Sequence, residues 1–474
     1  MATISTAFNI AKGALDADQA ALDIVANNTA NVNTPGYTRE LPVWEQNDAV
    51  SFNGLSFGTG VSMTGPQSQR SRVLEQALRQ QTQTASASSA RLDALNQMQA
   101  LFSGATGAGG GGASGIGTDL SNFFQTFASL EASPADEALR QNVLSAAGTL
   151  ASDFNGAAAQ LATQKQSLDE ESGSVVQQAN ALLGNIAGLN LEIESQSPNR
   201  DAGSLEDQRQ QDLTSLSQLI GIRTVTTENN GLTVTTMNGA LLVSQGQSFQ
   251  MTSGMSGGVT GFFDSQGNSI TGDLTSGGGA LGGILTARDQ DIPQVATALD
   301  QLACGLATAV NTQNAAGSDL NGNPGGAIFT RADGSPITGA TDLAAGIAVG
   351  MTDSAGIAAA ASGAGSSDDS NAVAMAALQN AGLVNGISPT AAFSDLVTNL
   401  GSQTSEVASE NTAQQAGLTQ LQNQIGALSG VNLNDEAASL ETLEQSYQAA
   451  SKLFTILASV MTSALNLGVQ TSYT

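Results

Sequence analysis

Apolar residues recur every seven positions at both ends of this 474-residue chain. Near the N-terminus the repeat consists of Phe8, Leu15 and Leu22, and a second line of Ile4, Ala11 and Val25 is interrupted at Asp18. Near the C-terminus one line is formed by Leu433, Leu440, Tyr447, Phe454 and Met461, and a second by Leu443, Ala450, Leu457 and Ala464. Such a repeat lies along one side of a helix, because 3.5 residues is close to one turn. The two ends therefore predict terminal helices that pair as an antiparallel coiled coil.

The terminal stripes indicate assembly rather than catalysis. The residues that we expect at the assembly interface are Ile4, Phe8, Leu15, Leu22, Val25, Leu433, Leu440, Leu443, Tyr447, Phe454, Leu457 and Met461. Burying a Leu or Phe side chain contributes roughly 1.5–3 kcal/mol, whereas ordering one residue's backbone costs roughly 1–2 kcal/mol. A lone amphipathic helix is therefore marginal, so we expect order at the ends only when neighbouring copies surround them. The alternative is a hairpin packed on the body of the same chain.

The first helix is expected over residues 3–30 and should end in the Asn/Thr-rich stretch that follows. Pro35 disfavours helical geometry at the preceding residue, and Pro-Gly is a natural turn pair. Residues 38–66 favour an extended segment with a small hairpin. The residues expected to form the turn that leads out of the terminal helix are Asn31, Asn33, Pro35, Gly36 and Tyr37.

Helical spacing dominates the region between the ends. It predicts helices over residues 73–102, 119–195, 204–220 and 289–314, and again from residue 371 to the C-terminus, with a glycine-rich loop at residues 104–117. Residues 133–137 read Ser-Pro-Ala-Asp-Glu, which is typical of a helix start with Pro in the first turn. Residues 204–207 read Ser-Leu-Glu-Asp, which fits a capping box.

Residues 222–284 have a different character. Two β-branched runs, residues 222–227 and 232–236, flank an Asn-Gly pair, which is a strong hairpin signal. A second hairpin is expected to turn through residues 264–268. We therefore predict an elongated, mainly α fold with β insertions. Its expected domains are a terminal helical polymerisation core (1–60 plus 430–474), a helical-bundle-plus-β middle domain (61–221 plus 285–429) and a small β-rich outer domain (222–284).

The amino-acid composition argues against several classes of function. The net charge of −27 argues against binding to nucleic acid or insertion into a membrane surface that is itself anionic. Histidine is absent, so the commonest general base and metal ligand is missing. The one cysteine, Cys304, is expected to be a buried core thiol rather than a nucleophile. We therefore expect a protein that is not an enzyme and that has no metal site and no cofactor.

Three local patterns imitate functional motifs. Residues 107–112 match the dinucleotide pattern GxGxxG, but any glycine run satisfies it and this one follows a helix. Residues 319–323, Asp-Leu-Asn-Gly-Asn, resemble the start of a calcium loop, but Pro324 and Thr330 replace the required Gly and Glu, so a polar turn is expected. Residues 453–469 lack charge, yet regular polar positions favour an amphipathic helix over a membrane span. The first 20 residues do not have the pattern of a signal peptide.

Two segments at opposite ends resemble the paired signatures of the flagellar rod, hook and hook-associated proteins. Residues 28–37 read Asn-Thr-Ala-Asn-Val-Asn-Thr-Pro-Gly-Tyr. The companion is Ser-Gly-Val-Asn-Leu-Asn-Asp-Glu-Ala-Ala at residues 429–438, followed by Leu-Glu-Gln-Ser-Tyr-Gln-Ala-Ala-Ser-Lys at 443–452. The long helical section after residue 73 and the segment 281–289, Leu-Gly-Gly-Ile-Leu-Thr-Ala-Arg-Asp, are most similar to the hook-associated members.

The resemblance implies a structural subunit at the junction between hook and filament, located outside the cell on the flagellum. It also implies export in an unfolded state through the flagellar type III apparatus without a cleaved signal peptide, and assembly into a homo-oligomeric ring. The implied partners are the hook protein, hook-associated protein 3 (FlgL) and an FlgN-like export chaperone. Alternatives are a distal rod or hook protein of the same family and, from another class, a secreted cell-wall hydrolase.

Overall fold

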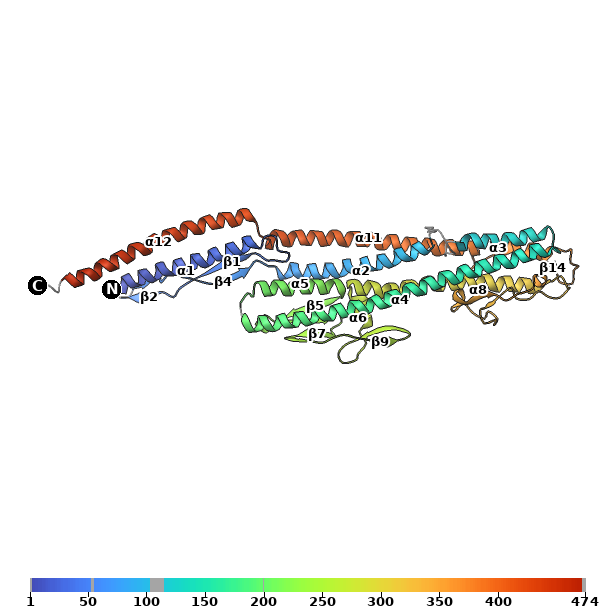
Figure 1. Cartoon of the computed structure of the whole chain (residues 1–474), viewed down its shortest axis with the longest axis horizontal. Helices are drawn as coiled ribbons and strands as arrows, with labels where there is room; N and C mark the ends of the chain where they lie inside the picture. The colour runs from blue at the N-terminus through green and yellow to red at the C-terminus, as the bar shows by residue number, and fades with distance from the viewer. Residues whose placement is uncertain (1, 53–54, 103–114, 199, 471–474) are drawn as a thin grey trace.

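The computed structural model describes residues 2–52, 55–102, 115–198 and 200–470, and the molecule is elongated (Figure 1). Helix α1 (Ala2–Ala30) and helix α12 (Leu433–Gln470) lie side by side at one end. The body that fills the rest of the length is built mainly from helices. This architecture confirms the predicted elongated, mainly helical fold with β insertions.

The spine of the body is α4 (Glu137–Gln196), a helix of 60 residues that is about 90 Å long at 1.5 Å per residue. The other body helices are α2 (Arg72–Phe102), α3 (Ile116–Glu131), α5 (Ser204–Leu219), α8 (Ile292–Ala316), α10 (Ser370–Ala377) and α11 (Pro389–Ser429). Each of these helices has a stripe of apolar residues at helical spacing, and this stripe is buried against the other helices. Phe123 of α3 contacts Phe124, Phe127 and Phe329, and these rings are buried in the same core as Phe154.

Two helix starts differ in detail from the sequence prediction. Helix α4 begins at Glu137, and the N-cap is Asp136, whose Oδ1 accepts hydrogen bonds from the backbone of Ala138 and Leu139. Pro134 therefore lies in the preceding turn rather than in the first turn of the helix. The predicted capping box at residues 204–207 is wrong, because the N-cap of α5 is Gly203 and makes no side-chain capping bond. Glu206 instead forms an ion pair with Arg70, and Asp207 accepts hydrogen bonds from Thr38 and Arg70.

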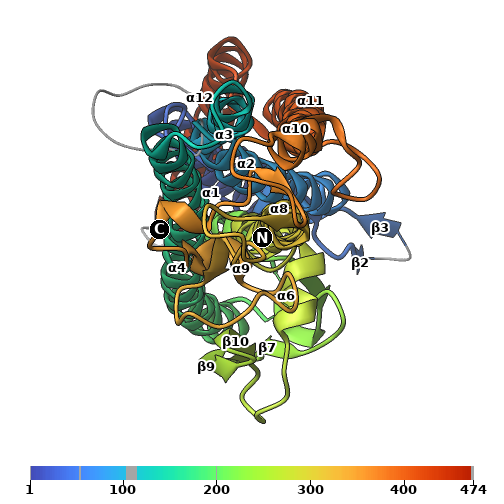
Figure 2. The same ribbon diagram turned by 90° about the vertical axis from the view of Figure 1, so that its right-hand side faces the viewer.

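The two sheets formed by strands β5 to β10 lie on the side of the molecule away from α11 and α12 (Figure 2). Strands β5 (Ile222–Thr226), β6 (Leu232–Thr236), β7 (Leu241–Ser244) and β8 (Gln247–Ser248) form one antiparallel sheet in that order. Strands β5 and β6 form the hairpin that the Asn-Gly signal predicted, and the loop between them includes the turn η2 (Glu228–Asn230). Positive φ occurs at Asn229 and Asn230, whereas Gly231 has a φ of −66°. Strands β9 (Thr252–Ser256) and β10 (Val259–Phe263) form a separate hairpin. Residues 264–268 follow β10 and lead only to an isolated bridge between Phe263 and Ser269.

The predicted β-rich segment also contains two helices that the sequence did not reveal. They are α6 (Thr271–Gly277) and α7 (Gly279–Thr286), and the π-helical turn η3 (Ala287–Asp291) joins α7 to α8. Glycine disfavours helix, but here it permits close packing. A Cβ at Gly283 would collide with the backbone carbonyl of Ala87 on α2. Residues 281–288 are thus a tightly packed core segment, and Asp289 after them is exposed.

Short elements complete the body between α8 and α11. They are β11 (Gly317–Ser318), β12 (Phe329–Arg331), α9 (Leu343–Gly346), β13 (Ile347–Val349), η4 (Ser354–Gly356), β14 (Ala360–Ala361) and η5 (Leu378–Asn380). The calcium-loop imitation is a polar turn, because Oδ1 of Asp319 accepts hydrogen bonds from the backbone of Asn321 and Asn323. Cys304 is half-buried at the edge of the core rather than fully buried as expected.

Two further sequence predictions concern the glycine pattern at residues 107–112 and the uncharged segment at residues 453–469. The glycine pattern at residues 107–112 lies outside the described residues. Among the described residues, no helix is long and apolar enough to cross a membrane, and this includes the described part of α12.

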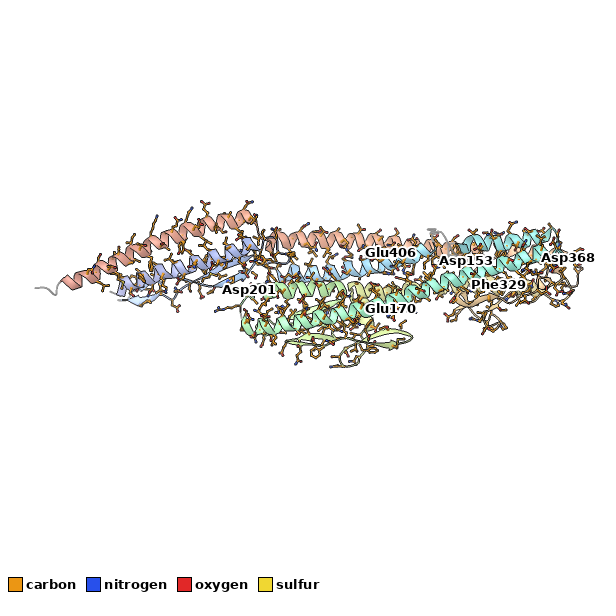
Figure 3. The ribbon with its side chains drawn as sticks, in the orientation of Figure 1. Asp153, Glu170, Asp201, Phe329, Asp368 and Glu406 are labelled. Atoms are coloured by element: carbon orange, nitrogen blue, oxygen red, sulfur yellow. The ribbon has the colours of Figure 1, made fainter. Side chains whose placement is uncertain are left out.

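A carboxyl pair in the body makes its stability depend on pH. Asp153 of α4 is buried, toward the end of the body far from the termini (Figure 3). Burial, and then a hydrogen bond with the Asp119 carboxyl, raises the pKa of Asp153 from 3.8 to about 7. The folded protein therefore binds more protons than the unfolded chain between roughly pH 4 and 7, so stability falls as pH rises through that window.

We expect Asp153→Asn to remove most of this pH dependence. The wild-type Tm should fall relative to that of the variant as pH rises from about 5 to about 8, because only the wild type must release the buried proton. Thermal unfolding followed by circular dichroism at both pH values checks this expectation. Parallel Tm profiles for the two proteins would contradict it.

Candidate assembly site at the paired termini

The terminal helices pair in antiparallel fashion. The ring of Phe8 on α1 contacts that of Phe454 on α12, with centroids 4.4 Å apart, and Ala21 and Val25 form a buried cluster with Leu443. Residue numbers thus rise along α1 as they fall along α12. Ile4, Leu15 and Leu22 of α1 and Leu457 of α12 are half-buried.

The two apolar lines of α12 have different environments. The line containing Leu443 faces α1. Of the other line, Phe454 contacts Phe8 on α1, whereas Leu433, Leu440, Tyr447 and Met461 are 52, 39, 38 and 44% exposed. Leu453, Ile456, Val460 and Leu465 are exposed as well. A helix that is apolar on several faces is usually buried in its working state. Among the described residues of one copy, however, α12 packs against one helix, α1, and the end of α12 extends past the start of α1 (Figure 1). The role of these residues as contacts between copies stays a prediction.

Few apolar side chains are buried between α1 and α12, and we call this contact the seam. Asp18 interrupts the apolar line of α1; its side chain is buried, and its Oδ2 atom accepts no hydrogen bond from any described residue. A buried carboxylate oxygen without a partner destabilises the helix pair. The seam and the body form separate apolar clusters, so the pair can come apart without disturbing the body core.

At the body end of the seam, Asn28 forms the centre of a hydrogen-bonded joint. Its Nδ2 donates to Oε2 of Glu436 on α12 and to the backbone carbonyl of Glu40, at 3.2 and 2.8 Å. Its Oδ1 accepts from the hydroxyl of Tyr37 and the backbone N–H of Glu40. Glu436, only 2% exposed, also accepts from Nε of Arg39 at 2.6 Å. Burial and the neighbouring carboxylates raise the pKa of Tyr37, so its hydroxyl stays a donor.

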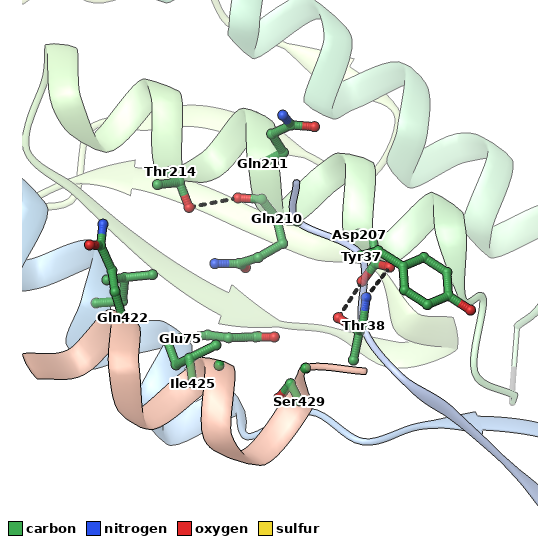
Figure 4. Close-up of a pocket in the computed structure, with 14 residues that line it drawn as sticks. Tyr37, Thr38, Glu75, Asp207, Gln210, Gln211, Thr214, Gln422, Ile425 and Ser429 are labelled. Atoms are coloured by element: carbon green, nitrogen blue, oxygen red, sulfur yellow. Dashed lines mark hydrogen bonds between the residues drawn. The ribbon is translucent and has the colours of Figure 1, made fainter. Parts of the chain in front are cut away.

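The joint continues into the body. Asp207 of α5 accepts hydrogen bonds from the backbone and hydroxyl of Thr38 at 2.9 and 2.6 Å, as Figure 4 shows beside a cleft that Tyr37 also lines. Asp201 (labelled in Figure 3) accepts from Ser68, the last residue of strand β4 (Val61–Ser68), which pairs with β1 (Glu40–Gln46). The backbone N–H of Arg39 donates to the carbonyl of Ser429, the last residue of α11. The joint therefore ties both terminal helices to the body.

The predicted turn residues lie at this joint. Oδ1 of Asn31 accepts from Thr34, its Nδ2 donates to the backbone of Asn27, and Gly36 has a φ of +80° that other residues rarely adopt. Of the other predicted turn residues, Asn33 and Pro35 are exposed, and Tyr37 bonds to Asn28.

Sequence reasoning missed the residues that connect the two ends. Asn28, Arg39 and Glu436 are part of, or next to, the two signature segments. However, the bond between Asn28 and Glu436 spans 408 positions, and no local pattern predicts it. The only available signal was that polar residues recur beside helix ends in both segments.

Comparison with known proteins agrees with this architecture. Residues 95–329 match the family model of the flagellar hook-associated protein FlgK helical domain. Residues 8–38 match that of the flagella basal body rod protein. The flagellar hook-associated protein 1 of Escherichia coli K12 is 26% identical over 98% of this chain and its own full length. That of Bacillus subtilis is 29% identical over 49% of this chain and 46% of its own length.

A solved structure shows the same fold. The flagellar hook junction protein FlgK from Burkholderia pseudomallei has a TM-score of 0.66 and 20% identity, covering 75% of this chain and all of that one. These relatives favour a hook-associated protein over a distal rod or hook protein, and they give no support to a cell-wall hydrolase. Taken with matches that extend from the terminal segment through the helical body, they show that the chain belongs to the flagellar hook-associated protein 1 (FlgK) family.

Proposed function

We propose that this chain is a structural, non-catalytic subunit of the flagellum that joins the hook to the filament by assembling through its terminal helices. The observation that carries this proposal is the apolar surface of α12 that faces away from α1. Each buried Leu or Ile side chain contributes roughly 1.5–3 kcal/mol, so neighbouring copies that cover this surface would stabilise an assembly strongly. Membership of the hook-associated protein 1 family supports the junction as its location.

The proposed partners follow from that location. Copies of the chain form a ring, with the hook protein on one side and hook-associated protein 3 (FlgL) on the other. The chain leaves the cell unfolded through the flagellar type III apparatus, without a cleaved signal peptide, after an FlgN-like chaperone has held its C-terminal region. The small number of buried contacts between α1 and α12 supports this route, because the two helices can then separate and unfold at a low cost in free energy.

The proposed domain division is the one expected from the sequence. Residues 1–60 with 430–474 form the polymerisation core, residues 61–221 with 285–429 the middle domain, and residues 222–284 the outer domain. The separate apolar cluster of the seam supports the first boundary. The candidate interface residues keep their proposed role, with those on the outer side of α12 contacting other copies.

Deleting the gene for this chain and then restoring it tests whether the chain is needed to attach the filament to the hook. Cells that lack the chain should bear hooks without attached filaments, because no adaptor then links the two. A tagged copy should restore filaments, and immunoelectron microscopy should place its label in a narrow band between hook and filament. Normal filaments in the deletion strain, or label spread along hook or filament, would refute the proposal.

A further inference from the structure

A second exposed apolar surface lies on the β-ribbon beside α1. The ribbon consists of β1 (Glu40–Gln46), β2 (Val50–Phe52), β3 (Leu55–Phe57) and β4 (Val61–Ser68), in which β1 pairs with β4 and β2 with β3. Val50 and Phe57 are paired across the strands, and Leu55 lies two residues before Phe57. The three side chains therefore share one face, because side chains alternate along a strand. They are 55, 48 and 64% exposed for Val50, Phe57 and Leu55, and we call them the ribbon patch.

No helix among the described residues covers the ribbon patch. β1 and β4 pack on α1, where a Cβ at Gly60 would lie 3.4 Å from Ile10, while α12 packs on another face of α1 through Phe454. In Figure 1, α1 lies between α12 and the ribbon. A short two-stranded ribbon with free edges and exposed large apolar residues is an unfinished surface.

The outer side of α12 offers a complementary surface. Leu453, Ile456 and Val460 recur at helical spacing and are 48, 59 and 45% exposed; we call them the helix patch. Lys452 borders it and is the only basic residue in α12. On the ribbon, the exposed acids Glu45 and Asp48 precede Val50. The two patches therefore match in apolar character and carry opposite charge at their edges.

We propose that the ribbon patch of one copy docks on the helix patch of a second copy of this chain, with Lys452 facing the acidic residues before Val50. This inference rests on the proposed function, because it specifies how copies meet in the ring. The two patches lie on different faces of the terminal segment, so the contact is head to tail. Each copy uses both patches once, and repetition of such a contact generates a ring or a helical row.

Cross-linking between two differently tagged copies tests the contact. One copy carries Phe57→Cys and the other Ile456→Cys, both in a Cys304→Ser background, and both are produced in cells that lack the untagged chain. Mild oxidation of isolated flagella should give a disulfide-linked product that carries both tags. The matched control replaces Phe57→Cys with Ser56→Cys, whose side chain points to the other face of the strand and should give no product.

The outcomes separate this inference from the proposed function. Tagged copies that are present in flagella but give no more product than the Ser56→Cys control overturn the docking contact and leave the junction role intact. If the Cys304→Ser parent itself is absent from flagella, the proposed function fails first, and the inference fails with it.

A charge exchange tests the contact without cysteines. Lys452→Glu and Asp48→Lys should each reduce swimming in soft agar, because each places like charges at the contact. The double variant should recover swimming, since it restores an opposite-charge pair. Both residues are exposed, so neither change disturbs the core. A double variant that swims no better than the worse single variant would overturn the inference.

Discussion

Replacing Leu443 with Asp should abolish swimming while leaving the body folded. Leu443 is 9% exposed and packs on Ala21 and Val25, which are the only other members of the buried seam cluster among the described residues. The change removes an apolar contact and buries a charge, so we expect the α1–α12 pair to lose more than about 3 kcal/mol. The body core is a separate cluster and should keep its Tm.

Two measurements check this expectation. Thermal unfolding by circular dichroism should give the same main transition for Leu443→Asp and wild type, and electron microscopy should show hooks without filaments. The matched control is Gln448→Asp, which adds the same charge at an exposed position of α12. That control should swim normally. Normal swimming of Leu443→Asp would show that the seam is not needed for assembly.

Local patterns predicted much of this fold. The first helix, expected over residues 3–30, is observed as Ala2–Ala30, and the Asn-Gly pair lies at the hairpin between β5 and β6. Both signals depend on short-range geometry, which the sequence states directly. The glycine-rich helix α7 was missed because its stability comes from contact with α2, and propensity alone argues against it.

The candidate site could be predicted only in part. Both lines of α12 have seven-residue spacing, so the spacing cannot tell which residues face α1; the structure places Leu443 of one line and Phe454 of the other there. The choice follows from packing at Leu443 and from the bond between Asn28 and Glu436. Glu206 and Asp207 illustrate the same limit. Their spacing resembles a capping box, but in the structure their side chains make tertiary contacts with Arg70 and Thr38.

Glu436→Ala should weaken the attachment of the paired helices α1 and α12 to the body, because Glu436 is part of the hydrogen-bonded joint. Glu436 is almost fully buried and accepts from both Arg39 and Asn28. Removing one partner of a buried ion pair leaves an uncompensated charge, so we expect the docked state of α12 to lose about 3 kcal/mol. That loss corresponds to a reduction of roughly a hundredfold in the docked fraction.

Hydrogen exchange of the full chain measures this effect directly. Amides at the start of α12 and the end of α1 should exchange faster in Glu436→Ala, whereas amides of α4 should be unchanged. The matched control is Glu441→Ala on the same helix, because the exposed Glu441 bonds only weakly, to Gln445 at 3.4 Å.

A double-mutant cycle separates the joint from a general weakening of α12. If Arg39 acts through Glu436, then Arg39→Ala combined with Glu436→Ala should cost less than the sum of the two single changes, because the second removes a charge that the first has already left unpaired. Additive costs would mean that the two residues act independently. In that case the signature segments would stabilise their own helix ends, and the ion pair between Arg39 and Glu436, which spans 397 positions, would have no role in aligning the terminal pair with the body.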